Sequence, residues 1–584
     1  MSAAVRAEPE GDGTRRVPAG EGVGRTPVPR QGAEVSGQGD RVRRPGAENG
    51  GTAVGASCVG ADGSAPVSGP GGGAPVSVAG GAGAGQETGS GPFVTDLLDA
   101  AAVAWPDSVA VRDEGGAWSH AGLADASRAV AGRLRRAGVG PGDRVVLRLG
   151  NRREFVALYY GVLRAGAVVV PLNPEMKPFV LRGVLADAAP ALVVLDPAEP
   201  EAVRDVVAGC GARAVAPAEL LAGGASGYVP GPVPRSADAV AQLIYTSGST
   251  SAPKGVVCTH RQVVFAARAI ARRLGYGPGD VVLAALPLSF DYGLYQLLLA
   301  AIGGCEVVLA DASAPVRVLS LLREHRATVV PVVPSLAEML CRLAARGTPP
   351  AHVRLFTSTG AALPGPAIDA LRTRFPGAAV VAMYGITECK RVTVAAPDAD
   401  RDRPGAVGLP LDGTTVAVLD ARGRVLGPGQ VGEIVVGGPH VMSGYWNAPG
   451  QTAARYRPDP AAPGRTRLHT GDHGHLDADG HLYVGGRVDD QFKRRGVRMS
   501  TPEIEAAALD VPGVRTAAAL PPRDGLDLRL VVTGERDLTE RQVLDGLALR
   551  LEAAKVPARC RIVDRLPLTP NGKTDKKALD TDEH

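Results

Sequence analysis

Apolar and polar residues change their period repeatedly along the chain from Phe93 onward. The segments 92–113 and 153–174 each begin with apolar residues at helical spacing and end with a short apolar run that is typical of a buried strand. Between them, a helical pattern ends at Gly138 and leads through a turn into another strand. Strands that alternate with amphipathic helices predict a mostly parallel sheet covered by helices on both faces. Further apolar runs of this kind occur at 192–195, 281–286, 306–309, 328–332 and 379–382.

The pattern changes twice in the second half of the chain. From residue 404, short strands separated by glycine-rich turns predict a small all-β subdomain. After Gly486, a strand-and-turn region precedes helix-like stretches at 501–509 and 539–552. We therefore expect this last part of the chain to form a separate domain.

Residues 1–92 contain no aromatic residue and are rich in Gly, Ala, Pro, Ser and Arg. Such a composition buries too little apolar surface to offset the entropy of ordering, so we expect a disordered tail. The arginines at 15, 16, 41, 43 and 44 leave open a basic interaction tail, and a start codon assigned too far upstream is a further alternative. No apolar run follows the N-terminus, so a secretory signal is not predicted.

Length and composition limit the class of protein. A chain of 584 residues is too long for one ordinary domain, and a net charge of +4 gives no reason to expect binding of nucleic acid. Seven scattered cysteines without a C-x-x-C pair suit reduced thiols, so we expect a cytoplasmic protein. No apolar run reaches the roughly 18 residues of a membrane span, so no membrane is expected as a partner.

The stretch Tyr245–His260, "YTSGSTSAPKGVVCTH", gathers small and hydroxyl residues ahead of Lys254. Small residues let backbone N–H groups approach a polyanion closely, hydroxyls add donors, and the lysine adds a positive charge. Binding a triphosphate requires these features. The stretch is not a Walker loop, which needs G-x-x-x-x-G-K-[ST] opening a helix. By itself it is equally typical of a solvated turn between two strands.

The segment "TSGSTSAPKG" resembles the phosphate-binding signature of the adenylate-forming superfamily: acyl-CoA synthetases, nonribosomal-peptide adenylation domains and luciferases. It departs from the usual pattern at Ser251, where glycine is commoner. The resemblance covers residues 93–584 and implies an α/β fold. A large N-terminal domain (93–488) would hold two doubly wound α/β subdomains plus a small β-barrel, and a small mobile α+β domain (489–584) would follow. Further segments resemble the superfamily's motifs in the expected order: 357–364, 382–391, 468–480, 483–505 and 566–579.

The resemblance implies an ATP site with assigned roles. Glu388 would hold the Mg²⁺ that bridges the phosphates of ATP, and Thr387 would contact the α-phosphate. Tyr384 would lie along the adenine, and the carboxylate of Asp472 would accept both ribose hydroxyls. The residues expected around ATP or AMP are Thr246, Ser247, Gly248, Ser249, Thr250, Gly360, Tyr384, Gly385, Asp472, Arg487 and Arg498.

The same resemblance assigns roles in the C-terminal domain. Lys573 would bridge the substrate carboxylate and the α-phosphate during adenylation, and Asp489 would be the hinge about which this domain rotates. Gly496 and its neighbours would then replace Lys573 beside an incoming thiol. Taken alone, the basic run 493–498 is typical of a solvated surface loop. The residues expected to be catalytic are Lys254, Thr387, Glu388 and Lys573.

The segment 286–300, "LPLSFDYGLYQLLLA", is expected to line the acid pocket. Asp291 falls where amino-acid adenylation domains place the aspartate that holds the substrate ammonium. A buried lone carboxylate is costly, so Asp291 needs a cation, either a substrate amine or Arg391. Asp291 is alternatively the N-cap of the helix that follows. The residues expected in this pocket are Phe290, Asp291, Tyr292, Tyr295, Thr359, Met383 and Arg391.

The implied activity is that of an ATP-dependent, AMP-forming acid–thiol ligase of specialised metabolism. A carboxylate oxygen would attack the α-phosphate of ATP, with Mg²⁺ assisting, and the acyl group would pass to coenzyme A or a carrier-protein phosphopantetheine. Activation of an amino acid, of an amino-aryl acid, or of an unusual acid such as nitrite with an amine acceptor remains an alternative. A different class, an inactive nucleotide-binding scaffold, is disfavoured because Lys254, Glu388, Asp472 and Lys573 occur together.

Overall fold

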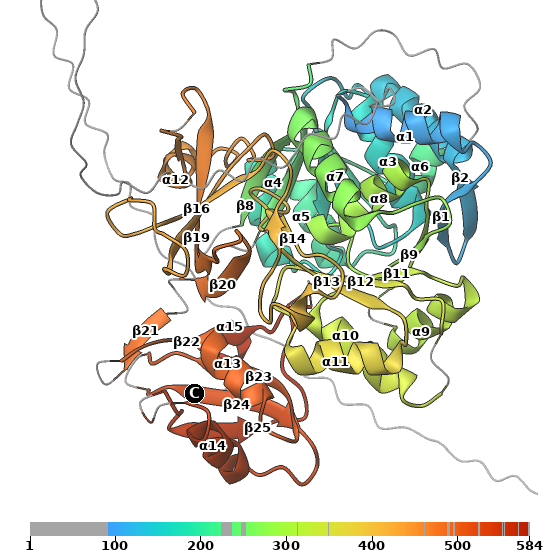
Figure 1. Cartoon of the computed structure of the whole chain (residues 1–584). Coiled ribbons are helices and arrows are strands. Elements are labelled where there is room, and N and C mark those ends of the chain that lie inside the picture. Colours follow the sequence, from blue (N-terminus) through green and yellow to red (C-terminus); the bar gives the residue numbers. More distant parts are fainter. Residues whose placement is uncertain are drawn as a thin grey trace, which may run out of the picture. The chain divides into compact units, whose positions relative to one another are not determined.

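The computed structural model describes residues 92–222, 236–246, 253–311, 314–347, 350–460, 462–487, 491–494, 497–523, 526–551, 553, 555–569 and 572–581. These residues form two large sheets with helices around them, a smaller antiparallel sheet, and a C-terminal α+β region (Figure 1). Strands and helices alternate along both large sheets, as the sequence pattern predicts.

The first large sheet has six strands in the order β6-β5-β3-β4-β7-β8, and all neighbours are parallel except β7 and β8. Its helices are α2 (His120–Arg136), α3 (Arg153–Arg164), α4 (Pro178–Ala188), α5 (Glu201–Gly209) and α6 (Pro217–Leu221). Its strands are β3 (Arg144–Arg148), β4 (Val168–Leu172), β5 (Leu192–Leu195), β6 (Arg213–Val215), β7 (Val240–Thr246) and β8 (Lys254–Thr259).

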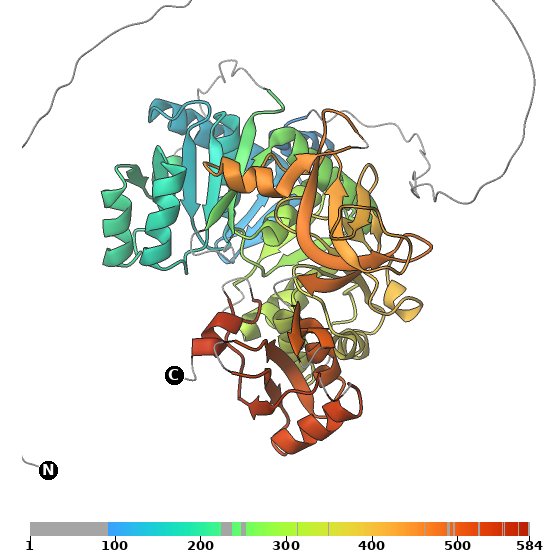
Figure 2. The same ribbon diagram turned by 90° about the vertical axis from the view of Figure 1, so that its left-hand side faces the viewer.

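Alternate residues of these strands enter two different cores. Val145 and Val169 face the main core, whereas Val146 and Val168 join a second core with the apolar residues of α4 and α5. Successive side chains of a strand point to opposite faces, so a sheet covered on both sides needs apolar residues at nearly every position. β4 meets this requirement, because all five of its residues are buried. Figure 2 shows α4 and α5 on one side of the sheet.

The second large sheet has nine strands in the order β15-β14-β13-β12-β11-β9-β10-β1-β2, and antiparallel strands stand at both edges. Its parallel centre explains the apolar runs of the sequence. Its helices are α1 (Val94–Ala104), α7 (His260–Leu274), α8 (Asp291–Gly303), α9 (Pro315–Glu324), α10 (Pro334–Ala344) and α11 (Gly365–Arg374). Its strands are β1 (Val109–Asp113), β2 (Gly116–Ser119), β9 (Val281–Ala284), β10 (Glu306–Leu309), β11 (Val329–Val332), β12 (Leu355–Ser358), β13 (Ala379–Tyr384), β14 (Thr393–Val394) and β15 (Leu409–Pro410).

The third sheet is antiparallel and differs from the predicted barrel. Its strands are β16 (Thr415–Leu419), β17 (Gly432–Gly437), β18 (Tyr456–Pro458), β19 (Thr466–Leu476) and β20 (Leu482–Arg487), with α12 (Pro449–Arg455) before β18. Long β19 pairs with β17, β18 and β20. Among the described strands, β16 pairs only with β17 and β20 pairs only with β19. The two described strands therefore do not pair with each other, and the sheet does not close into a barrel.

The C-terminal region has the α+β composition that the sequence predicts. Alternate residues of β23 and β24 point to opposite faces of the sheet and enter two small cores. One core includes residues of α13 and α14, and the other contains Leu579 of α15. The domain boundary near residue 488 stays a prediction. Its elements are β21 (Gln491–Arg494), β22 (Val497–Ser500), α13 (Thr501–Leu509), β23 (Val514–Leu520), β24 (Arg529–Gly534), α14 (Glu540–Ala548), β25 (Arg559–Ile562) and α15 (Lys576–Thr581).

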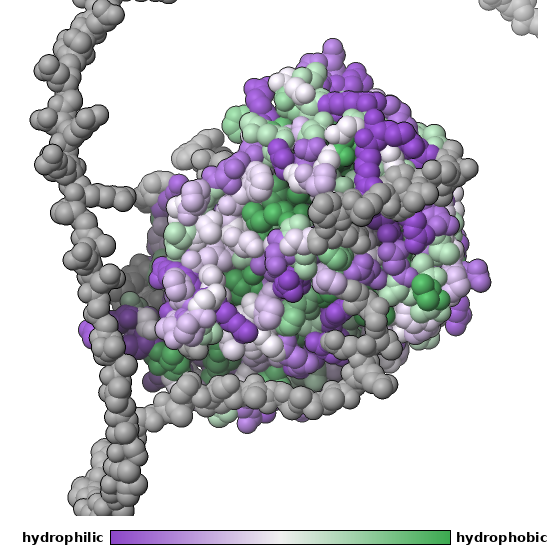
Figure 3. Space-filling view, turned by 90° about the horizontal axis from the view of Figure 1, so that it is seen from above, coloured by the Kyte–Doolittle hydropathy of each residue, from purple (hydrophilic) through white to green (hydrophobic). Residues whose placement is uncertain are grey.

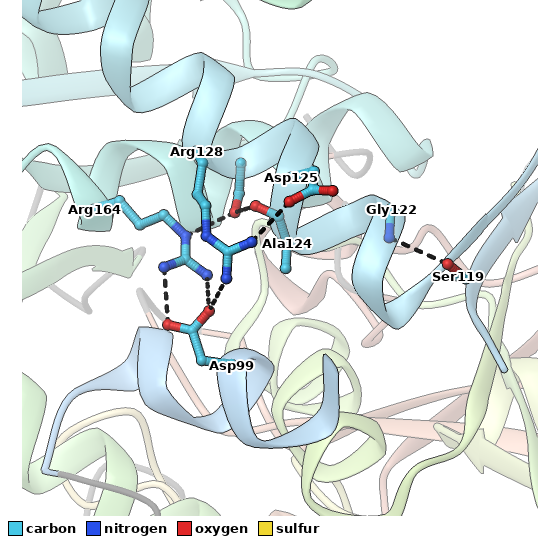
Figure 4. Close-up of polar contacts among 8 residues, drawn as sticks. Asp99, Ser119, Gly122, Ala124, Asp125, Arg128 and Arg164 are labelled. Atoms are coloured by element: carbon cyan, nitrogen blue, oxygen red, sulfur yellow. Dashed lines mark hydrogen bonds and ion pairs between the residues drawn. The ribbon is translucent and has the colours of Figure 1, made fainter. Parts of the chain in front are cut away.

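A partly buried polar network ties α1, α2 and α3 together (Figure 4). The guanidinium of Arg164 donates to both carboxylate oxygens of Asp99 at 2.9 and 2.7 Å and to Ser127 Oγ at 2.7 Å. Arg128 donates to Asp99 as well. Arg164 and Arg128 hold the pKa of Asp99 below its usual value, although burial opposes this shift. The network fixes the angle at which the three helices pack.

The surface seen from above in Figure 3 mixes hydrophilic and hydrophobic residues. None of the helices in the described part of the chain is both long enough and apolar enough to cross a bilayer.

The contact between α2 and α3 gives a stability test. A Cβ on Gly161 would lie 2.3 Å from Val130 Cγ1 and 3.1 Å from the carbonyl oxygen of Ser127, so the helices need glycine to approach this closely. We expect Gly161→Ala to lower the free energy of unfolding by about 2 kcal/mol through overpacking.

Gly183 of α4 is the matched control, because a Cβ at this position would have no other atom within 4 Å. Gly183→Ala should raise stability by roughly 0.5–1 kcal/mol, since alanine favours the helix. Thermal unfolding of both variants checks this, and equal melting temperatures would show that the close approach is not needed.

Candidate active site

The stretch expected to bind phosphate connects two neighbouring antiparallel strands, β7 and β8. Thr246 ends β7 and pairs with Lys254, which begins β8. The expected phosphate-binding residues Ser247, Gly248, Ser249 and Thr250 lie outside the described residues. The ammonium of Lys254 lies 5.6 Å from the centre of the Tyr445 ring, a distance at which a cation and an aromatic face attract.

A tight turn follows β13 and presents the expected magnesium ligand. Tyr384 ends the strand, and Thr387 and Glu388 follow in the turn. The chain doubles back so closely that a Cβ on Gly385 would lie 1.8 Å from the carbonyl oxygen of Lys390. Lys390 itself has a φ of +61°, which is strained for a residue with a long side chain. Only glycine fits at 385, so this residue shapes the turn.

Tyr445, from the loop before α12, connects Glu388 to the phosphate strand. Its hydroxyl donates to Glu388 Oε1 at 2.6 Å, and Glu388 is 8% exposed. The loop is itself anchored, because Met442 N donates to the carbonyl of Glu388 at 2.9 Å and Trp446 N to that of Gly255 at 2.7 Å. Glu388 and Lys254 therefore both contact Tyr445, although they belong to different sheets.

The residues expected at ribose and adenine also meet. The hydroxyl of Tyr384 donates to Asp472 Oδ2 at 2.6 Å, and Asp472 is buried in β19. Burial, and then the Asp472 carboxylate, raise the pKa of Tyr384 well above its usual value, so its phenol stays protonated. The backbone of Arg487 in β20 pairs with that of Asp472.

Asp291 and Arg391 face each other in the predicted acid pocket. Arg391 Nη1 lies 3.4 Å from Asp291 Oδ2, and both side chains are 5% exposed. The guanidinium also lies 4.7 Å from the centre of the Tyr292 ring. A charge-assisted bond is usually about 2.7–2.9 Å long, so this long contact leaves both groups able to bind a further partner.

The helix-cap alternative for Asp291 is wrong. Asp291 is the first residue of α8 and Phe290 is its N-cap, without a side-chain cap bond. The Asp291 carboxylate instead points to Arg391. The ring of Tyr292 is anchored from the other side, because its hydroxyl donates to the carbonyl of Thr357 at 2.6 Å.

Four buried polar atoms in α8, at the end of β12 and in the turn after β13 have no hydrogen bond to a nitrogen or oxygen atom of the described residues. They belong to one ammonium and three hydroxyl groups, and the ammonium of Lys390 lies 5.9 Å from the centre of the Tyr295 ring. Lys390 is fully buried. Burial raises the pKa of the neighbouring Cys258 thiol, and the positive charge of Lys390 opposes that rise. Buried polar groups are normally paired, so these atoms have capacity for further hydrogen bonds. The atoms are Tyr295 Oη, Ser358 Oγ, Thr359 Oγ1 and Lys390 Nζ.

Gly360 is flanked by the side chains of Phe290 and Lys573. A Cβ on Gly360 would lie 3.4 Å from Phe290 Cζ and 3.5 Å from Lys573 Cε. The loop of Lys573 is held by Ser335 Oγ, which donates to the carbonyl of Gly572 at 2.8 Å. Met383, also expected in the pocket, is buried in β13. The side chain expected to neutralise the α-phosphate thus reaches the strand ends that hold the pocket.

Some expected site residues are placed only in part. Asp489 and Gly496 lie outside the described residues, and for Arg487 and Arg498 the backbone alone is described, in β20 and β22. Their predicted roles stay predictions.

Sequence reasoning missed three residues of this site. Lys390 stands between Glu388 and Arg391, so a second cation beside a pocket arginine was visible in "TECKR". Ser358 directly precedes Thr359 at the end of β12. Tyr445 gives no sequence signal, because it reaches Glu388 only through the folding of a distant loop.

The fold and the arrangement of the site residues are those expected for an adenylate-forming enzyme, and comparison with known proteins supports this class. Residues 98–446 match the AMP-binding enzyme family and residues 503–573 match the AMP-binding enzyme C-terminal domain, so the chain belongs to this family. It is an AMP-forming ligase that uses ATP to activate a carboxylic acid as an acyl adenylate and transfers the acyl group to a thiol. The resemblance seen in the sequence is confirmed.

Individual relatives cover most of the chain. A sulfoacetate–CoA ligase from Cupriavidus necator is 33% identical over 83% of this chain and 96% of its own length. An L-proline–[L-prolyl-carrier protein] ligase from Streptomyces coelicolor is 33% identical over 78% of this chain and 90% of its own. The crystal structure of VinN is 46% identical and covers 68% of this chain and 98% of its own, with a TM-score of 0.62. A further structure shows VinN with L-aspartate, at 45% identity.

One relative is far longer than this chain. The chain matches 6% of a probable non-canonical nonribosomal peptide synthetase, CymA, from Salinispora arenicola, at 34% identity.

The bond between Tyr384 and Asp472 gives a test of the nucleotide side of the site. Tyr384→Phe removes a buried donor to the carboxylate, so we expect the KM for ATP to rise roughly threefold to tenfold while the KM for the acid stays unchanged. Steady-state pyrophosphate exchange measures both constants.

Tyr483→Phe is the control, because Tyr483 lies in neighbouring β20 and contacts Asp477 at a weak 3.5 Å. An equal rise in both KM values for Tyr384→Phe, or the same rise in the control, would contradict the assignment.

Proposed function

We propose that the acid activated by this ligase is an amino dicarboxylic acid of the aspartate type, and that the acceptor is the phosphopantetheine thiol of a carrier protein. The observation that supports this most strongly is the ammonium of Lys390, which is fully buried and has no carboxylate partner among the described residues. A buried cation without an anionic partner is costly, and a ligand carboxylate would lower that cost.

The charges of the pocket match such a substrate. Asp291 supplies one negative charge, and Arg391 and Lys390 supply two positive charges. A substrate ammonium would pair with Asp291, and a side-chain carboxylate would pair with the two cations. Ser358 Oγ and Tyr295 Oη would add donors to that carboxylate. The reacting carboxylate would lie near Lys573.

The relatives support both halves of the proposal. VinN was crystallised with L-aspartate, and the prolyl ligase transfers its amino acid to a carrier protein. The sulfoacetate–CoA ligase suggests a second candidate, an acid with a second anionic group but no amine, transferred to coenzyme A. The buried carboxylate of Asp291 favours the amine-bearing acid, because that substrate alone supplies a cation for it.

The reaction would be largely one of positioning. An oxygen of the substrate carboxylate forms a bond to the α-phosphorus of ATP, and the bond from that phosphorus to the bridging oxygen of pyrophosphate breaks. Lys573 and Lys254 would neutralise negative charge on the phosphate oxygens, and Tyr384 would keep Asp472 oriented toward ribose. No side chain needs to act as a nucleophile. We propose Asp489 as the hinge and Gly496 as part of the surface that receives the thiol.

Glu388 suits the proposed Mg²⁺. Its buried carboxylate has a second oxygen besides the one that accepts from Tyr445, and Mg²⁺ is commonly bound by one or two carboxylates plus phosphate oxygens. In the described part of the chain no cluster of three or more His, Cys, Asp or Glu could hold a metal alone, so ATP would supply most ligands. The ion would offset charge on the phosphates.

Substrate choice is tested by ATP–pyrophosphate exchange with a panel of L-aspartate, succinate, β-alanine, sulfoacetate, anthranilate and a long-chain fatty acid. We expect L-aspartate or another amino dicarboxylic acid to be preferred. Lys390→Met should reduce its kcat/KM roughly tenfold to a hundredfold while sparing β-alanine, because a charge-assisted bond contributes about 1.5–3 kcal/mol. Asp291→Asn should reduce the preference of the enzyme for the amino acid over succinate.

Lys177→Met controls for the loss of a lysine, since Lys177 is exposed before α4. Loading of a phosphopantetheinylated carrier protein against coenzyme A then identifies the acceptor. Preference for the fatty acid or for succinate, or a uniform loss across the panel in Lys390→Met, would refute the proposed substrate class.

The proposed metal role is tested by titrating Mg²⁺ during exchange. Glu388→Gln should raise the half-saturating Mg²⁺ concentration at least roughly tenfold, while ATP binding measured without metal changes little, because only the charged oxygen binds the ion strongly. Glu433→Gln is the control, because Glu433 accepts from His469 and Gly471 in the neighbouring sheet. Unchanged Mg²⁺ dependence in Glu388→Gln would mean that another group holds the ion.

A further inference from the structure

Asn151 lies where the two large sheets meet. It stands between β3 of the six-stranded sheet and α3. Its side chain reaches the nine-stranded sheet, where Nδ2 donates to the carbonyls of Ala284, at the end of β9, and Ala310, just after β10, at 3.2 and 3.0 Å. The carbonyl of Ala284 also accepts from the backbone N–H of Ala310 at 3.1 Å, so the Asn151 amide lies against a backbone bond that joins the ends of β9 and β10.

The same side chain holds the loop that leads into the acid pocket. Nδ2 also donates to the carbonyl of Leu286 at 2.9 Å, and Oδ1 accepts from the backbone N–H of Leu288 at 3.0 Å. Both leucine side chains are almost fully buried. The two N–H groups of Nδ2 are shared among three carbonyls, and with the bond that Oδ1 accepts these four contacts hold the backbone between β9 and α8.

We propose that Asn151 is a positioning residue for the acid substrate. The loop it holds continues within three residues to Phe290 and Asp291, the N-cap and first residue of α8. The loop has one further internal bond, from Phe290 N to the carbonyl of Pro287 at 3.0 Å. The Asn151 bonds thus set where Asp291 begins its helix, and so its approach to Arg391. Asn151 contacts neither pocket charge and acts through the loop backbone.

Asparagine suits this position because its short side chain carries both a hydrogen-bond donor group and an acceptor. Aspartate would keep the acceptor for Leu288 but turn a second oxygen toward three carbonyls. Alanine would leave all four backbone groups without this partner. The inference rests on the ligase reaction and not on which acid is bound.

The first experiment is hydrogen–deuterium exchange on the intact chain, which needs no ligand. In Asn151→Ala, peptides covering 285–292 should exchange roughly tenfold faster, since the Leu288 amide loses its acceptor. In Asn151→Asp, that amide should stay protected. Unchanged exchange in Asn151→Ala would overturn the inference.

The second experiment separates positioning from general stability. In pyrophosphate exchange, the KM for L-aspartate should rise roughly tenfold in Asn151→Ala while the KM for ATP stays within about twofold. If wild type prefers another acid of the panel, the proposed substrate class fails, and the same comparison is made with that acid. Asn151→Asp, which loses the donated contacts but keeps the acceptor for Leu288, should show the same split to a smaller extent, and this gives a second measurement if the alanine variant folds poorly.

Ser127→Ala is the matched control. It removes a buried hydroxyl that bonds Arg164 Nε and the carbonyl of Ala124 in the network of Figure 4. It should lower the melting temperature without changing either KM. An equal rise in both KM values for the Asn151 variants, or the same split in Ser127→Ala, would show that Asn151 is merely structural.

Discussion

The site depends on one constraint: the carboxyl ends of parallel strands leave backbone groups that loops must satisfy. β7, β9, β12 and β13 all end at site segments, and their last residues lead into Thr246, the 285–290 loop, Thr359 and the turn of Glu388. Open α/β sheets bind ligands at these ends because the loops there are free to vary. In this chain the loops are tied to each other as well as to the strands.

Two side chains make most of these contacts between loops and strands. Asn151 joins the ends of β3, β9 and β10, and Tyr445 brings the 442–446 loop against both Glu388 and Lys254. Neither side chain belongs to the motif segments that define the family. Residues with assigned chemistry are thereby held in place by residues that take no part in it, and rigid support of this kind keeps reacting groups at productive distances.

The pocket concentrates charge where burial makes charge expensive. Asp291, Arg391 and Lys390 are all buried, and the Asp291–Arg391 contact is long for an ion pair. A fully satisfied pair would favour an empty, stable pocket, whereas this arrangement leaves capacity on all three groups. The proposed ligand of matching charge would recover the stability given up at such a site, and under that proposal the same residues would determine specificity.

The sequence by itself determined the class of fold and the order of the site motifs. Nearly continuous apolar runs such as that of β4 have to be strands buried on both faces, and helix α13 begins and ends where its pattern predicts, at 501 and 509. Glycine at 385, the "TECKR" turn and Asp472 were recognisable because their chemistry is local to short segments.

Only the tertiary structure decided which residues meet. Asp291 could have been a cap, a ligand for an amine or a partner of Arg391, and the direction of its side chain at the start of α8 excluded the cap. The burial of Lys390 beside Tyr295, the bond from Tyr445 to Glu388 and the four contacts of Asn151 each join segments far apart in sequence. Periodicity and motifs report local geometry, and contacts between distant segments are set by how sheets and loops pack, so no pattern along the chain could have fixed them.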